Sequence, residues 1–373
     1  MRILPTLLCQ SGMRLGKTIF TDKGQVLVGV HVSLTDNMIR KLSQMGIQHL
    51  YIDDPRTDDI HIVDPIQEET RLLLSSSLSK VFEKFGATAG ISSAAPDSFS
   101  TMSKFFVEGM SRVIDDLQTL NNDHVMVSTL NQVLPSSMEQ HFTQKALNMC
   151  IHATKLAMAE GSFNREELMN IGLSALLYDV GSVHLPLQLL QKADHLTQNE
   201  YLEIKKHPEY GFQLLKNEAG IPEVAALCAL QHHERINGSG YPYGLTKDEI
   251  HPYARWIGML DSYDALIHPR SYRQALPPNL ALEALYAGAG TLYDIDMVRL
   301  FRNHVAIFPI GLSVSLSSGD KGVVSQLNFK SMQRPVIRVL KNASGEDLKE
   351  PYEIDLSRKL NIVITKIGEQ TMV

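Results

Sequence analysis

Residues 231–244 read QHHERINGSGYPYG and hold the densest group of chemically informative side chains in the sequence. Adjacent residues of a helix point about 100° apart, so His232 and His233 can reach one ion only near a helix end or wall. The glycines that follow permit backbone angles that other residues avoid, and Pro242 fixes its own φ angle. The residues alone leave two interpretations open: a metal-binding pair beside a rigid loop, or one packed and one exposed histidine before a structured turn.

Three further side chains could complete a metal site: Asp179, His207 and Asp261. Neutral imidazole and carboxylate together suit iron, manganese, zinc or nickel better than calcium. Asp179 lies in the apolar run LLYDVG, where a carboxylate is costly unless it is paired or metal-bound. Its alternative role is to cap the turn at Gly181. His207 precedes a proline, so it could also be an ordinary helix-end residue.

The region around these residues has helical periodicity from about residue 131 to 303. Apolar residues recur at helical spacing in three segments: ALNMCIHATKLAMAEG (146–161), ELMNIGLSALLYDVG (167–181) and EYLEIKKHPEYGFQLLKN (200–217). We therefore expect a mainly α protein, with a helical domain over residues 131–305.

The flanking segments differ from this domain. Residues 1–62 combine a hairpin pattern, a helix from Ser33 to Met45 and a strand at IQHLYI (47–52), which indicates a small α+β module. Residues 63–130 are expected to form a helical linker region, interrupted by the Gly/Ala/Ser-rich stretch 86–100. Residues 306–373 are rich in β-branched residues and glycine turns, so a β-rich C-terminal extension is predicted.

Composition limits the possible functions. A net charge of −6 argues against a binder of nucleic-acid polymers or anionic membranes, but a small anionic ligand needs only a local cationic pocket. No apolar run approaches the roughly 20 residues that cross a bilayer. The three cysteines are far apart, which is typical of free thiols in a reducing cytoplasm.

In combination, these motifs resemble a known family. HHERINGSGYPYGL is similar to the HHE…GYP signature of HD-GYP phosphodiesterases, and the resemblance covers at least residues 140–303. Three other segments match elements of that family in the same order: KKHPEYG (205–211), MLDSYDAL (259–266) and PRSYRQAL (269–276).

The resemblance implies a helical bundle that holds iron or manganese ions and hydrolyses cyclic di-GMP. One site would use Asp179, Asp261 and two further histidines. The other would use Asp179, His207, His232 and His233. The basic residues that bind the phosphates would be Arg270 and Arg273. The alternative interpretation is that these two arginines belong to a solvated surface turn. The loop Gly240–Tyr241–Pro242 would form a lip for the substrate or for a protein partner.

Three positions depart from the family pattern. Lys145 and Tyr178 stand where the two histidines of the first site are expected, and Ser182 replaces a lysine. We considered His141, His152 and His184 as substitutes and judged each improbable. Lys145 could supply a positive charge in place of the first ion, paired with Asp179 or Asp261.

We therefore expect one divalent ion, iron or manganese, in place of two. The predicted function is a cytoplasmic phosphodiesterase of cyclic di-GMP signalling whose activity is impaired. The alternative is a non-catalytic cyclic di-GMP receptor or an interaction module that contacts signalling proteins. A third hypothesis is an HD-type hydrolase that acts on a different phosphoester with a single metal.

Overall fold

The structure is a computed structural model, and its chain divides into two compact units. It describes residues 1–20, 25–47, 49–86, 97–119, 126–127, 138–192, 194–268, 275–367 and 370–371. The first unit contains residues 1–64, 127–136 and 303–373, and the second contains residues 65–126 and 137–302. The sequence led us to expect four segments. In the structure, the N-terminal and C-terminal segments belong to the same unit. Most of the predicted linker, residues 63–130, belongs to the other unit together with the helical domain.

The N-terminal part of the first unit is the predicted mixture of strands and one helix. Its elements are β1 (Arg2–Pro5), β2 (Arg14–Leu15), β3 (Ile19–Phe20), β4 (Val26–Val28), α1 (Asp36–Gln44) and β5 (His49–Asp53). The strands β1 and β2 pair with β5 in an antiparallel sheet. Helix α1 begins after Thr35, whose side chain accepts a hydrogen bond from the backbone N–H of Met38.

The C-terminal part of the same unit is a six-stranded sheet with the order β11-β10-β9-β8-β12-β13. Its strands and the preceding β7 are β7 (Val305–Ala306), β8 (Ser313–Leu316), β9 (Lys321–Gln326), β10 (Val336–Lys341), β11 (Asp347–Asp355), β12 (Ile364–Ile367) and β13 (Gln370–Thr371). The two parts are joined: Ile3 donates a backbone hydrogen bond to Gly311, and Arg56 bridges Asp54 and Asp347 at 2.7 Å each. Both ends of the chain therefore build one body.

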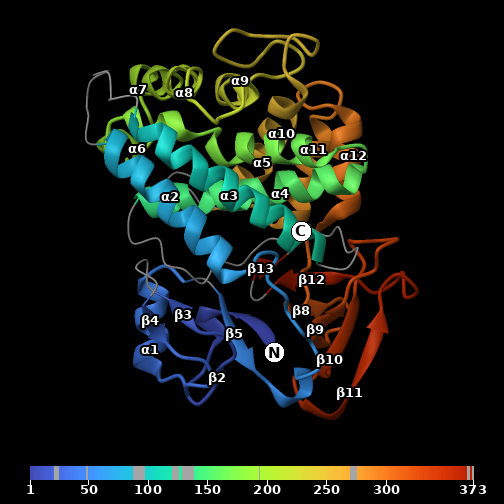
Figure 1. The fold of residues 1–373 in the computed structure, drawn as a ribbon. Helices are drawn as coiled ribbons and strands as arrows, with labels where there is room; N and C mark the ends of the chain where they lie inside the picture. Colours follow the sequence, from blue (N-terminus) through green and yellow to red (C-terminus); the bar gives the residue numbers. More distant parts are fainter. Residues whose placement is uncertain are drawn as a thin grey trace. The chain divides into compact units, whose positions relative to one another are not determined.

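The second unit is helical, as predicted (Figure 1). Its longer helices are α2 (Glu68–Gly86), α3 (Asp97–Thr119), α4 (Met138–Glu160), α5 (Arg165–Leu177), α8 (His207–Leu215), α9 (Glu223–Gln231), α10 (Pro252–Ile267), α11 (Pro278–Ala287) and α12 (Ile295–His304). Short helices lie between them: the 3₁₀ turn η3 (Val180–His184), α6 (Leu187–Leu190) and α7 (Gln198–Ile204). The strand β6 (Met126–Val127) lies between α3 and α4.

Glycines let these helices meet closely around the candidate site. A Cβ added to Gly181 would lie 2.0 Å from the carbonyl oxygen of His207, and one added to Gly258 would lie 2.4 Å from that of His232. Since neither backbone could move freely, only glycine fits at these two contacts. They bring η3 against α8, and α10 against the end of α9.

Two properties concern the molecule outside the site. Among the residues that the structure describes, no helix is both long and apolar enough to cross a membrane. Cys9, Cys150 and Cys228 are all buried free thiols, as the sequence predicts. Burial raises the pKa of Cys150 and Cys228 to about 12, so both stay protonated near neutral pH.

Candidate functional site

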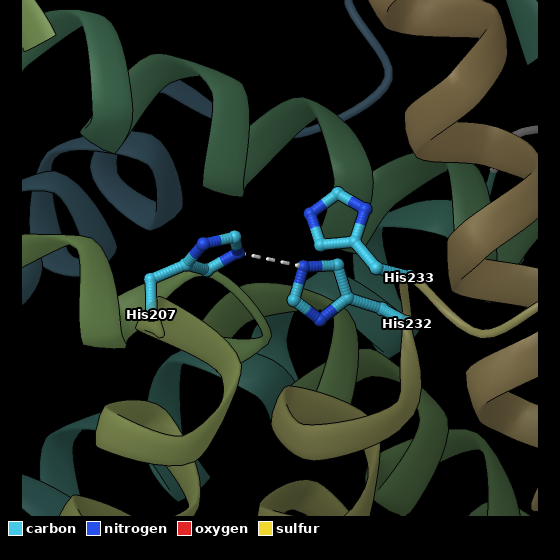
Figure 2. Close-up of side chains that lie close together, drawn as sticks. All are labelled: His207, His232 and His233. Atoms are coloured by element: carbon cyan, nitrogen blue, oxygen red, sulfur yellow. Dashed lines mark hydrogen bonds between the residues drawn. The ribbon is translucent and has the colours of Figure 1, made fainter. Parts of the chain in front are cut away.

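Three histidines converge in the helical unit (Figure 2). His207 is the first residue of α8, while His232 and His233 directly follow the last residue of α9. The pair thus lies at a helix end, which is where two adjacent imidazoles can turn toward one point. Ligand atoms of the three side chains lie within 4.8 Å of one another. His207 and His232 are fully buried in the protein.

The hydrogen bonds of two of these rings fix which nitrogen carries the proton in the neutral imidazole. Nδ1 of His207 lies 2.7 Å from the carbonyl oxygen of Ile204, and Nδ1 of His232 lies 2.9 Å from that of Ala229. A carbonyl oxygen only accepts, so each Nδ1 carries the proton and each Nε2 presents a lone pair. The two Nε2 atoms face each other at 3.2 Å.

Two facing lone pairs repel unless a cation lies between them. Burial lowers the pKa of His232 to about 4, so an added proton on this ring is disfavoured at neutral pH. Imidazole–metal bonds of about 2.1 Å at roughly tetrahedral or right angles would separate two nitrogens by about 3.0–3.4 Å. The observed separation therefore fits a shared divalent ion.

Two carboxylates lie beside the histidines: Asp261 is buried, and Asp179 is partly buried. Asp179 Oδ1 is 3.5 Å from His207 Nε2, near enough to contribute a further ligand. Its other oxygen, Oδ2, is 3.2 Å from Lys145 Nζ, and the same ammonium lies 2.8 Å from Asp261 Oδ1. Tyr178 donates its hydroxyl hydrogen to Asp261 Oδ1 at 2.8 Å. One lysine therefore pairs with both carboxylates.

The electrostatics of this group keep Lys145 charged. Burial acts to lower the pKa of Lys145, but the charges of Asp261 and Asp179 together raise it well above its usual value. Burial acts to raise the pKa of both aspartates, but Lys145 and the neighbouring histidines hold it below the usual range. The site therefore contains two carboxylates and a permanent internal cation at neutral pH.

Asp179 does not lie within a helix, contrary to the sequence-based expectation. Helix α5 ends at Leu177, and Asp179 is the residue before the 3₁₀ turn, to which its side chain gives no capping hydrogen bond. Its carboxylate instead accepts a hydrogen bond from Ser182 Oγ at 2.7 Å. Ser182 thus contacts the same carboxylate that Lys145 binds.

Hydrogen bonds to Glu234 stabilise the loop that follows the histidine pair. The buried carboxylate of this residue accepts hydrogen bonds from the backbone N–H groups of Tyr243 at 2.8 Å and Leu245 at 3.0 Å. Tyr241 stacks on His233, with ring centroids 4.5 Å apart and an angle of 18° between planes, and its bond to Pro242 is cis. The loop therefore places one aromatic ring directly on the histidine cluster.

Some of these contacts were not anticipated. Glu234 lies inside the HHE signature, but we assigned it no role. Arg235 donates to the carbonyl oxygen of His232 at 3.1 Å and to Ser262 Oγ, which ties the end of α9 to α10. Arg270 and Arg273 lie outside the described residues. His184 packs against Tyr210, with ring centroids 5.8 Å apart, and is not part of the histidine cluster.

Gly240 provides a direct test of the loop. A Cβ at this position would lie 2.4 Å from Glu234 Cα and 2.6 Å from the carbonyl oxygen of His233. We expect Gly240→Ala to lower the free energy of unfolding by about 1–3 kcal/mol, because backbone atoms must move apart. Denaturant titration followed by the fluorescence of Trp256, the single tryptophan, measures the change. Ser239→Ala, which adds no atom there, serves as control, and an equally stable Gly240→Ala variant would contradict the proposed packing.

Family models match most of the helical unit and the β-rich end of the chain. Residues 129–297 match the HD domain family, and residues 313–372 match a KOW domain associated with the HD domain. The second match covers most of the predicted C-terminal extension. The first covers every described residue of the histidine and carboxylate cluster.

Curated relatives share the helical region. The chain is 32% identical over 187 residues to a cyclic di-GMP phosphodiesterase of Pseudomonas aeruginosa, which covers 50% of this chain and 45% of that protein. It is 36% identical over 183 residues to the cyclic di-GMP phosphodiesterase response regulator RpfG of Xanthomonas campestris, covering 48% of each. A 3'3'-cGAMP-specific phosphodiesterase of Vibrio cholerae is 34% identical over 143 residues, covering 38% of this chain and 31% of that protein. The match therefore spans less than half of the length of these relatives.

The helical fold and the histidine–carboxylate cluster define an HD domain. Together with the HHE…GYP loop and these relatives, they show that the helical region, residues 129–297, belongs to the HD-GYP family. Phosphohydrolases with this domain depend on metal ions, and the three histidines are a group that could bind one.

Proposed function

We propose that this protein binds cyclic di-GMP through a centre with one divalent ion and hydrolyses it only slowly. The ion, iron or manganese, would be held by His207, His232, His233 and Asp179. The names of the relatives support cyclic di-GMP as the ligand, and the single-ion centre follows from the side chains of this chain. The buried free thiols are compatible with a cytoplasmic protein.

One observation carries the proposal of weak hydrolysis. The ammonium of Lys145 lies within 3.2 Å of oxygens of both Asp179 and Asp261. Family analogy assigns these carboxylates to a first metal ion, whose two histidine ligands are absent. A fixed cation between them repels a second divalent ion, while the hydroxyl of Tyr178 takes part of the remaining coordination capacity of Asp261.

The residues of the chain define what the centre can do. A divalent ion on the histidines would polarise a phosphate oxygen of the ligand and offset its charge. Tyr241 would contact the ligand from the lip, where it already stacks on His233. Lys145 stays protonated, so it acts as a fixed positive charge and not as a proton acceptor. With one ion in place of two, the attacking water and the phosphate are no longer held by a shared pair.

The test combines metal counting with turnover. We expect purified protein loaded with manganese or ferrous iron to contain about one ion per chain and to bind cyclic di-GMP. Its hydrolysis should be slower by orders of magnitude than that of an intact family member, because several kcal/mol of stabilisation are lost. Elemental analysis, equilibrium dialysis and product chromatography measure the three quantities. Two ions per chain with full turnover would overturn the proposal.

A receptor function is the second candidate. It is favoured because the loop Gly240–Tyr241–Pro242 is retained beside a centre in which Lys145 takes the place of a metal ion. In this case cyclic di-GMP binds with no turnover, and the lip or the flanking unit contacts a signalling protein. Parallel titrations with cyclic di-GMP and 3'3'-cGAMP show which of the two nucleotides the protein binds. The second is included because a relative is a 3'3'-cGAMP-specific phosphodiesterase. Binding of neither nucleotide would favour an interaction module or an HD-type hydrolase of another phosphoester.

A further inference from the structure

Lys205 lies at the edge of the histidine cluster in an unusual setting. It follows the last residue of α7, two residues before His207. Its Nζ lies 4.7 Å from the ring centroid of Tyr201 and 4.8 Å from that of Tyr241. Because Tyr241 also stacks on His233 at 4.5 Å, the lysine, the tyrosine and the histidine form a continuous series of contacts.

The ammonium of Lys205 is positioned by two aromatic rings, which do not neutralise its charge. Aromatic rings attract a cation through their quadrupole and leave its net charge unchanged. Within the described part of the chain, no carboxylate oxygen lies within 4.0 Å of Lys205 Nζ. The adjacent Lys206 differs, since its Nζ pairs with Glu203 at 2.6 Å. Lys206 therefore forms an ion pair, whereas Lys205 contacts only aromatic rings among these neighbours.

The faces around Lys205 are open to a ligand. Tyr201 is 43% exposed, and Lys205 is half-buried. An ammonium on two rings loses little further side-chain freedom when it binds an anion, so its orientation favours binding. Exposed tyrosine rings also offer stacking surfaces to nucleobases.

We propose that Lys205, oriented by Tyr201 and Tyr241, forms a second anion subsite that binds a ligand phosphate beyond the histidine centre. A cyclic dinucleotide carries two phosphates, one for the histidine centre and one for Lys205. The identity of this ligand rests on the proposed function, but the subsite itself rests only on the contacts of Lys205. It makes Lys205 a specificity-determining residue that favours a second phosphate over a neutral group.

Binding of cyclic di-GMP to matched variants tests the subsite. We expect Lys205→Met to weaken the Kd at least about tenfold, because a charge-assisted hydrogen bond is lost. Lys206→Met, the neighbouring control, should change the Kd less than about twofold. Lys205→Arg should restore binding, since a guanidinium keeps the charge and stacks on both rings. Equal affinities of wild type and Lys205→Met would overturn the subsite.

A second measurement separates the subsite from the proposed function. Inorganic phosphate is titrated at low salt into protein with ¹³C-labelled lysine, and the Cε signal of Lys205 is assigned with Lys205→Arg. If the wild type binds no cyclic di-GMP, the proposed function fails, and the phosphate titration alone decides the subsite. A saturable shift of the Lys205 signal, larger than that of Lys206, supports it. Absence of that shift then overturns it.

Discussion

A variant that carries Lys145→His, Tyr178→His and Ser182→Lys is expected to bind two divalent ions and to hydrolyse cyclic di-GMP at least about a hundredfold faster than the wild type. The three changes restore the side chains that family analogy places there. They also remove the ammonium that lies 2.8 Å from Asp261 and the hydroxyl that donates to the same oxygen. Both carboxylates then become free to bind an ion.

The partial variants show which group limits activity. Lys145→His alone leaves the Tyr178 hydroxyl on Asp261, so we expect no second ion and little gain. Elemental analysis and initial rates with manganese or ferrous iron measure the outcome, while circular dichroism checks that each variant is folded. A folded triple variant that binds a second ion without faster hydrolysis would mean that another part of the site limits the reaction.

Lys145→Met should lower the free energy of unfolding by about 3–5 kcal/mol when metal is chelated. The substitution keeps the length of the side chain but leaves the buried Asp261 and the partly buried Asp179 without their common partner. The ammonium is largely shielded, with 17% of the Lys145 side chain exposed, so solvent cannot replace it readily. Urea titration in EDTA, followed by Trp256 fluorescence, measures the loss.

Two comparisons make this second experiment specific. Lys206→Met removes an exposed ion pair with Glu203, so the free energy of unfolding should stay close to that of the wild type. The double variant Lys145→Met with Asp261→Asn should be more stable than Lys145→Met alone, because one uncompensated charge is removed with its partner. If Lys145→Met were as stable as the wild type, the role of Lys145 as an internal cation would be refuted.

Several features of the site could be predicted because they depend on local sequence. The histidine pair required a helix end, and α9 ends at Gln231, one residue before it. The mainly helical character of the central region followed from its apolar periodicity. Lys145 and Tyr178 were identified as departures by aligning motifs, which does not require a structure.

Other features could not be predicted, because they depend on breaks in helices and on distances across the fold. The segment 200–217 has one continuous helical periodicity, yet it forms α7 and α8 with Lys205 and Lys206 between them. The periodicity of apolar residues shows which positions are buried, but it does not reveal a short break between two helices. Asp179 was placed in a helix for the same reason. The exposed tyrosine beside Lys205 had no sequence signal.

The sequence by itself determined the family of the helical region and the mainly α class, since these follow from the identity, order and periodicity of its residues. Only the tertiary structure decided that a single ammonium bridges Asp179 and Asp261, residues 82 positions apart in the chain. Pairing of this kind depends on packed helices that bring distant side chains within 3.2 Å. The tertiary structure likewise decided that Lys205 faces two tyrosines while Lys206 faces a carboxylate, because the turn between α7 and α8 sets their directions.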